Sequence, residues 1–183
     1  MSLTRGAVGL AVTFHAELTR VAACADDARV FLIAEDDAAF VADFGARFDA
    51  ALAALDAHDP AWDFLQVGYF GDDRTFAKPD IKDKAVRKLI AVPENVAGTG
   101  GIAFRPPGAR NVLRSLFPVD WQLDTALKQA YRSTRAYITR VPLMTSAHST
   151  QDNSDIQILP EGFAFDAAAN RPPAQKFKVK IQK

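Results

Sequence analysis

Three consecutive carboxylates, Glu35-Asp36-Asp37, directly follow a short apolar run at residues 30–34. Such a run is typical of a strand buried on both faces, so the carboxylates are expected at its carboxyl end. Like charges this close repel one another unless a cation or hydrogen-bond donors lie between them. Alternate side chains of an extended segment share a face, so Glu35 and Asp37 are expected to point together. Hard oxygen ligands in this arrangement suit Mn²⁺ or Mg²⁺, which would in turn bind a diphosphate.

A structural explanation of the same acidic residues stays open. Apolar residues at helical spacing over 38–57 predict a helix that begins near Ala38. A carboxylate just before a helix commonly accepts hydrogen bonds from the free backbone N–H groups of its first turn. Asp36 or Asp37 could therefore cap this helix rather than hold a metal.

A second acidic motif lies at residues 118–124, where Asp120 and Asp124 accompany a helical pattern over about 121–131. Two residues four apart share a helix face, provided that both lie on the helix. One of them could act as a general base toward a sugar hydroxyl. Alternatively, Asp120 caps the helix.

The run Gly98-Thr99-Gly100-Gly101 precedes an apolar segment at 101–104. Glycines there can let the backbone approach a ligand, or they can simply form a turn. The run is not a P-loop, because no Gly-Lys-Ser/Thr follows it. The chain also lacks a Gly-x-Ser-x-Gly elbow, and its histidines, His15, His58 and His148, do not have zinc-protease spacing.

The pattern of elements that must position these residues predicts a single α/β domain over residues 1–160. Apolar runs at 30–34, 64–67, 89–92 and 101–104 alternate with helical stripes at 7–23, at 38–57, after Pro106-Pro107 and at about 121–131. This alternation favours a mostly parallel sheet covered on both faces, with 30–34, 64–67 and 101–104 as its core strands. Ligands of such sheets bind outside the carboxyl ends of the strands. The remaining residues, 161–183, form a tail whose last part alternates like an edge strand.

Composition narrows the function classes. The 22 basic residues balance the 22 acidic ones, so no net positive field favours nucleic acid or an anionic membrane. No apolar run approaches the ~20 residues of a membrane span, and residues 1–20 do not resemble a signal peptide. The single cysteine, Cys24, gives no sign of a disulfide scaffold. We expect a soluble cytoplasmic protein.

The ordered motifs together resemble glycosyltransferase family 25, the lipooligosaccharide and procollagen galactosyltransferases. The pieces that carry the likeness lie between about residues 6 and 156 in the order and spacing of the family. They are Gly6 and Gly9, Glu35-Asp36-Asp37 with Phe40, Trp62-Asp63 leading to Gly68, Gly98-Thr99, Gly108-Ala109, Pro118 with Asp120, Leu123 and Asp124, and Ser154-Asp155-Ile156.

The resemblance implies a GT-A-like, Rossmann-type three-layer fold with a mostly parallel sheet. It also implies a metal-dependent, inverting transfer of a hexose, commonly galactose, from a UDP-sugar to a hydroxyl of a glycan or protein. Glu35 and Asp37 would bind Mn²⁺ or Mg²⁺, while Asp36, Gly98 and Thr99 would contact the nucleotide-sugar. Asp124 would be the base, and Asp120 a second catalytic candidate.

The chain departs from the family pattern at two places. The family's Ser-His pair is Thr13-Phe14 here, and Met1 stands almost on the glycine motif, which a strand–helix unit usually precedes in the family. That unit could be lost, its surface could come from another chain, or the sequence could be truncated. A domain that lost this unit could be a degenerate binding domain without turnover. Losing it would also expose a sheet edge, which the tail could cover in its own chain or in a homodimer.

Overall fold

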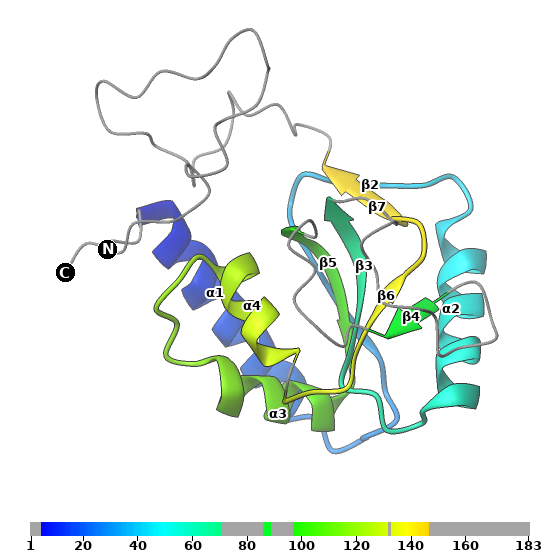
Figure 1. Ribbon diagram of the computed structural model, residues 1–183, viewed down its shortest axis with the longest axis horizontal. Coiled ribbons are helices and arrows are strands. Elements are labelled where there is room, and N and C mark those ends of the chain that lie inside the picture. Colours follow the sequence, from blue (N-terminus) through cyan, green and yellow to red (C-terminus); the bar gives the residue numbers. More distant parts are fainter. Residues whose placement is uncertain (1–4, 71–85, 89–96, 132, 147–183) are drawn as a thin grey trace, which may run out of the picture.

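A computed structural model describes residues 5–70, 86–88, 97–131 and 133–146 of this protein. It shows helices on two sides of a central sheet (Figure 1). The helices are α1 (Arg5–Ala22), α2 (Phe44–His58), α3 (Pro106–Leu116) and α4 (Leu123–Ala130). The strands are β1 (Phe31–Ala34), β2 (Ala38–Phe40), β3 (Phe64–Phe70), β4 (Val86–Lys88), β5 (Ala97–Phe104), β6 (Ala136–Thr139) and β7 (Met144–Ser146).

The strands of the described ranges form one mostly antiparallel sheet. Strand β5 lies between β1 and β3 and runs antiparallel to both. Strands β2 and β4 are antiparallel to β7 and β6, respectively, whereas β6 and β7 are parallel to β3. The fold is therefore α+β. The prediction of a GT-A-like, Rossmann-type three-layer fold with a mostly parallel sheet is wrong.

The error concerns strand direction rather than strand position. The apolar runs at 30–34, 64–67 and 101–104 do fall on β1, β3 and β5. Parallel neighbours need a crossover connection, usually a helix. In the described part of the connection from β3 to β5 the chain instead forms strand β4. An apolar run reports burial on both faces, and burial is compatible with either direction.

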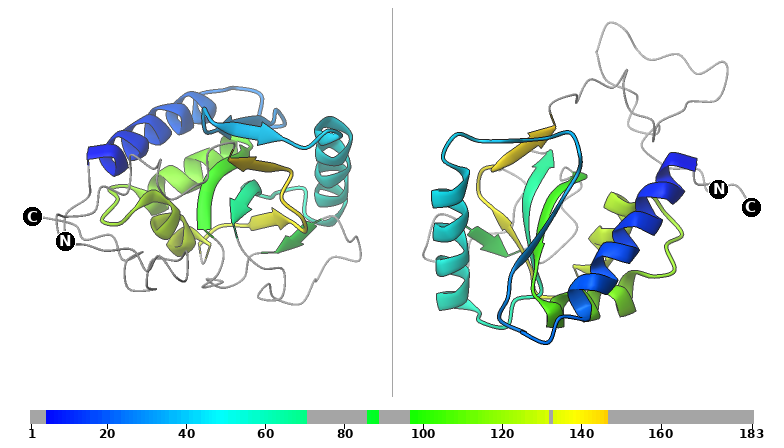
Figure 2. Two further views of the ribbon diagram at one scale, coloured as in Figure 1. Left: turned by 90° about the horizontal axis from the view of Figure 1, so that it is seen from above. Right: turned by 180° about the vertical axis from the view of Figure 1, so that it is seen from behind.

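The sheet curls until its two edges come close. Strand β1 pairs with β5 at one side, and β2 pairs with β7, which itself pairs with β3. Only residues 35–37 separate β1 from β2 along the chain. The sheet consequently forms a nearly closed, barrel-like structure, and its curvature is visible from above (Figure 2). The acidic trio Glu35-Asp36-Asp37 lies at the seam.

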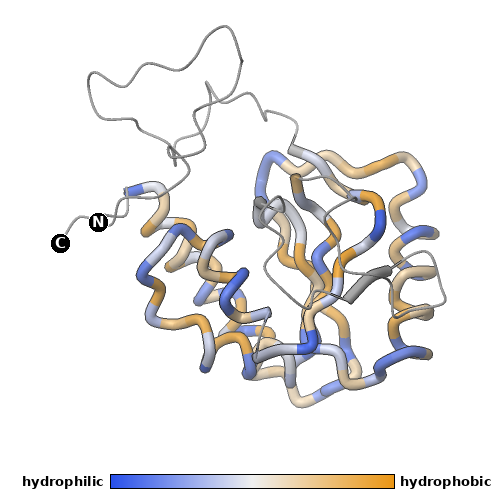
Figure 3. The backbone as a smooth tube through the Cα atoms, viewed as in Figure 1, coloured by the Kyte–Doolittle hydropathy of each residue, from blue (hydrophilic) through white to orange (hydrophobic). Residues whose placement is uncertain are grey.

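Two hydrophobic clusters pack the helices against the sheet. Figure 3 colours the backbone by hydropathy and shows hydrophobic residues along both the helices and the central strands. Helices α1, α3 and α4 cover one face, where Leu18, Phe64 and Phe104 are fully buried. Helix α2 covers the other face, where Leu55, Leu65 and Trp62 are buried. Burial of such large side chains is the main favourable term in folding.

The segment after the acidic trio does not start a helix. Residues 38–40 form β2, and α2 begins at Phe44 with Asp43 as its N-cap residue. The backbone N–H of Ala38 donates to the carbonyl of Glu35 instead (3.2 Å). Pairing of β2 with β7 thus overrides the local helical pattern. The alternative explanation of Asp36 or Asp37 as a helix cap is wrong.

The other predicted helices agree with the structure in position. The expected helices at 7–23, after Pro106-Pro107 and at 121–131 correspond to α1, α3 and α4. The predicted strand at 89–92, the Ser154-Asp155-Ile156 motif and the tail 161–183 lie outside the described residues. None of the helices within the described ranges is long and apolar enough to cross a membrane.

Candidate active site

Glu35 leaves the end of β1 and meets the start of β5. Its backbone N–H donates to the carbonyl of Gly100 (3.3 Å). Its side chain accepts a hydrogen bond from the hydroxyl of Thr99, a buried residue 64 positions away in the sequence. Two of the motifs that the sequence singled out therefore touch at the seam of the sheet.

The glycine run of β5 is explained partly by its own backbone. Gly98 has φ +95°, a conformation that L side chains rarely adopt, and a Cβ there would press on the ring of Phe70. A Cβ on Gly101 would collide with the side chain of Met144. At Gly100 a Cβ would have only ordinary contacts. Gly98 thus serves the irregular backbone of strand β5 and Gly101 the packing, whatever else they contact.

Two polar residues that the sequence analysis did not single out complete this region. Gln66 lies on β3, is 2% exposed, and donates from Nε2 to the carbonyl of Gly98 (2.7 Å). Tyr131, at the end of α4, donates its hydroxyl to Oε1 of Gln66 (2.9 Å). A glutamine inside the apolar run 64–67 was the signal available in the sequence.

Asp124 lies in the first turn of α4. Its carboxylate accepts hydrogen bonds from the backbone N–H (2.7 Å) and the hydroxyl (3.3 Å) of Thr125. Its charge acts on two residues of this region. Burial raises the pKa of Tyr131 strongly, and the Asp124 charge raises it further. The same charge also acts on Glu35.

Several groups of the site act on the pKa of the Glu35 carboxyl. Burial raises its pKa above the ordinary value, the hydrogen bond from Thr99 lowers it, and nearby carboxylates raise it again. Asp37 contributes more than Asp36, and Asp124 adds to both. Residues 36 and 37 form a turn, closed by the hydrogen bond from the Ala38 N–H to the Glu35 carbonyl, so the expected extended alternation of Glu35 and Asp37 is wrong. We name Glu35, Asp37, Gln66, Thr99, Asp124 and Tyr131 the acidic site.

Asp120 is not drawn into the acidic site by any contact that we find among the described residues. It is exposed, in the connection between α3 and α4. It borders a cavity of about 100 Å³ together with Trp121 and Gln129. The N-cap residue of α4 is Gln122, which makes no side-chain capping bond. The interpretation of Asp120 as the helix cap is therefore wrong.

The residues present fit a divalent cation only in part. In the ranges that the structure describes, no group of three His, Cys, Asp or Glu side chains gathers closely enough to enclose a metal ion. Mg²⁺ and similar ions, however, often take one or two carboxylates and complete their shell with water and substrate phosphates. Glu35 and Asp37 suit that second arrangement, because their repulsion is relieved by a cation.

Comparisons with known proteins do not identify the chain. No protein family model matches it, and no curated protein matches it. The resemblance to family 25 therefore depends on the ordered motifs. Within the described residues, three of these motifs, at Glu35, Gly98-Thr99 and Asp124, lie in one region.

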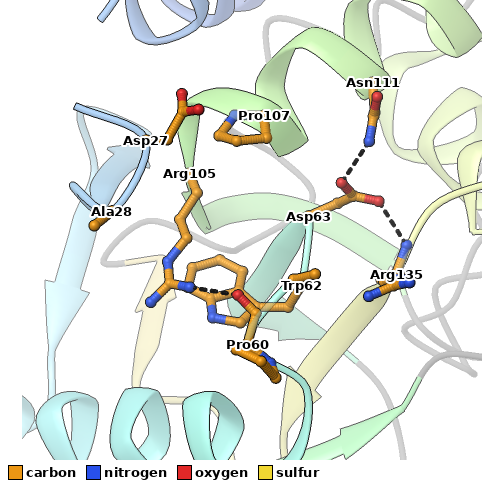
Figure 4. Close-up of a pocket in the computed structure, with 10 residues that line it drawn as sticks. Asp27, Ala28, Pro60, Trp62, Asp63, Arg105, Pro107, Asn111 and Arg135 are labelled. Carbon is orange, nitrogen blue, oxygen red and sulfur yellow. Dashed lines mark hydrogen bonds between the residues drawn. The ribbon is translucent and has the colours of Figure 1, made fainter. Parts of the chain in front are cut away.

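A second region lies at the opposite end of the strands, around a cavity of about 550 Å³ (Figure 4). Asp63 is buried there, and its carboxylate accepts hydrogen bonds from the side chain of Asn111 and the backbone N–H of Arg135 (both 2.7 Å). Arg105 stacks on Trp62 and pairs with Asp56 (2.6 Å). These charges neutralise one another, so the arrangement favours a stabilising role.

Proposed function

We propose that the acidic site binds a nucleotide-sugar and transfers its hexose to a hydroxyl group of a glycan or protein. The observation that carries the proposal is the contact between Glu35 and Thr99, which come from two separate motifs, together with the charge of Asp124 from a third motif, which acts on Glu35. Convergence of titratable groups with a perturbed pKa is typical of functional sites. The proposal does not depend on a parallel sheet.

The donor would lie against the seam of the sheet. Glu35 and Asp37 would hold Mn²⁺ or Mg²⁺ together with the diphosphate, and Asp36, Gly98 and Thr99 would contact the remaining part of the nucleotide-sugar. The cation would neutralise the negative charge of the departing UDP. Asp36 is exposed and the backbone at Gly98 is half-buried, so both are accessible to a ligand.

Asp124 is the candidate base. In an inverting transfer, the acceptor oxygen attacks the anomeric carbon while the bond from that carbon to the diphosphate breaks. Asp124 would take the proton of the acceptor hydroxyl, and UDP would leave. The carboxylate of Asp124 accepts hydrogen bonds from the backbone N–H and the hydroxyl of Thr125, which fix its position in the first turn of α4.

A second candidate function is binding of a nucleotide-sugar or glycan without turnover. The observation that favours it is that no three-ligand metal group is found among the described residues. Both functions use the same surface. They differ in whether Asp124 moves a proton.

Calorimetric titration of the protein with UDP, with and without Mn²⁺, tests the shared part of both functions. Binding of UDP that tightens in the presence of Mn²⁺ is expected. Incubation with labelled UDP-galactose and a panel of glycan and peptide acceptors then separates them, because only a transferase incorporates label. A protein that binds neither UDP nor Mn²⁺ would refute both functions.

A further inference from the structure

Gln66 bridges the sheet and helix α4 from a position with almost no access to water. It is one of the few buried polar residues of the described core, on a strand whose neighbours Leu65 and Val67 are fully buried. Its amide makes one hydrogen bond to each side, to the carbonyl of Gly98 and from the hydroxyl of Tyr131. A buried amide is tolerated only where such partners satisfy it.

The orientation of this amide follows from its partners. The carbonyl of Gly98 can only accept, so the NH₂ group of Gln66 must face it. The carbonyl oxygen of Gln66 then faces Tyr131, whose hydroxyl must donate. The three groups therefore form a directional chain of hydrogen bonds that ends on the backbone of strand β5 at Gly98, beside Thr99.

We propose that Gln66 is a positioning residue, which holds the Gly98 carbonyl and thereby places the Thr99 hydroxyl against Glu35. This inference rests on the proposed function, because it assigns Gln66 to the geometry of that site. Gly98 needs such a restraint, since it lies at an irregularity of strand β5 with φ +95° and has no side chain of its own to fix that conformation. Tyr131 anchors the far side of the amide and so limits its rotation.

Amide hydrogen exchange tests the positioning without any ligand. The Glu35 N–H donates to the carbonyl of Gly100 in β5, and the Asp63 N–H donates to the carbonyl of Arg135, at the other end of the sheet. In Gln66→Leu, we expect the Glu35 amide to exchange about tenfold faster relative to the Asp63 amide. Equal acceleration of both amides would mean a general loss of stability and would overturn the inference, as would no acceleration of either.

Tyr131→Phe provides a second variant should Gln66→Leu fail to fold. It removes one hydroxyl, keeps the ring in the core and leaves the bond from Gln66 to Gly98 in place. The Glu35 amide is then expected to exchange about threefold faster relative to the Asp63 amide. No relative change in this variant would contradict the anchoring role of Tyr131 and, where Gln66→Leu does not fold, the inference as a whole.

Binding of UDP with Mn²⁺ tests the connection to the site by a double-mutant cycle. Gln66→Leu is expected to weaken UDP binding about tenfold in the wild-type background and to have little effect in Thr99→Val, because both substitutions disturb one contact. Equal weakening in both backgrounds would refute the positioning role. If the wild-type protein binds neither UDP nor Mn²⁺, the proposed function fails. The exchange measurement then still decides whether Gln66 holds the backbone of β5 at Gly98.

Discussion

The carboxylates at the two ends of the sheet have opposite surroundings. At the end that borders the larger cavity, Asp63 accepts two hydrogen bonds, and Asp56, Asp59 and Asp27 each pair with an arginine. At the acidic site, the donor that we find for the Glu35 carboxyl among the described residues is the hydroxyl of Thr99. Three other carboxylates raise the pKa of Glu35.

This difference separates stabilising charge from charge held for binding. A buried carboxylate that is fully hydrogen-bonded contributes to the native state, and removing it leaves its partners unsatisfied. Carboxylates that gather closely enough to raise the pKa of one of them, as at Glu35, lower stability when that group is ionised, which is typical of sites that act on a ligand. The larger cavity is therefore not the better candidate, although size alone would favour it.

The largest effect is expected from Asp63→Ala. Removing this carboxylate leaves the amide of Asn111 and the backbone N–H of Arg135 without acceptors in the interior. We expect a loss of about 4 kcal/mol in the free energy of unfolding, measured by urea denaturation. Asp63→Asn keeps the shape and one acceptor, so it should lose about half as much. A loss under about 1 kcal/mol in Asp63→Ala would contradict the stabilising role.

Asp124→Asn should leave stability nearly unchanged but reduce transfer. Asparagine retains an oxygen to accept from Thr125, yet it cannot take a proton from the acceptor. We expect kcat to fall roughly a hundredfold or more, about 2.7 kcal/mol, with UDP affinity intact. Asp120→Asn is the matched control, because Asp120 is exposed and outside the acidic site. An equal fall in both variants would remove Asp124 from its role as base.

The sequence alone located most of the elements and part of the site. Apolar runs marked β1, β3 and β5, and helical spacing marked α1, α3 and α4. These patterns work because they report which faces are buried. They could not report strand direction, nor that residues 38–40 would pair with β7 rather than begin a helix. Both features depend on contacts between distant parts of the chain.

The site shows the same division. Carboxylates at Glu35 and Asp124 were visible because their residue types suit chemistry, but their proximity was not. Gln66 and Tyr131 escaped notice because a lone glutamine in an apolar strand and a tyrosine at a helix end have many ordinary explanations. Only the fold shows that they contact each other and that Gln66 contacts strand β5 at Gly98.

Asp37→Ala should weaken binding at the acidic site. The variant removes one of the two carboxylates proposed to hold the cation and diphosphate. We expect the Kd for UDP in the presence of Mn²⁺, measured by calorimetry, to rise about tenfold, which corresponds to about 1.4 kcal/mol of binding free energy. Asp27→Ala, at the other end, should leave this Kd unchanged. If UDP and Mn²⁺ bind Asp37→Ala as they bind the wild type, the metal site is assigned wrongly.

The smallest effect concerns stability against pH. Because the folded-state pKa of Glu35 is raised by burial and by neighbouring carboxylates, its protonated form favours the native state. That contribution is complete below the unfolded pKa and is lost as pH rises through the folded pKa. Glu35→Gln keeps an acceptor for Thr99 but never ionises. We expect this variant to be more stable than wild type at pH 7 by less than about 1 kcal/mol, since the carboxyl is partly in water.

Asp59, at the opposite end, should show the reverse sign and so tests the comparison itself. Burial alone would raise its pKa, but hydrogen bonds from Tyr137, the Ala61 N–H and Arg135 lower it overall. Its contribution is present above the unfolded pKa and is lost as pH falls through the folded pKa. Between pH 3 and 8, the free energy of unfolding of each variant should therefore move away from that of the wild type as pH rises. Glu35→Gln should become more stable than the wild type, and Asp59→Asn less stable. Displacement of both variants in the same direction would mean that the two ends do not differ as described.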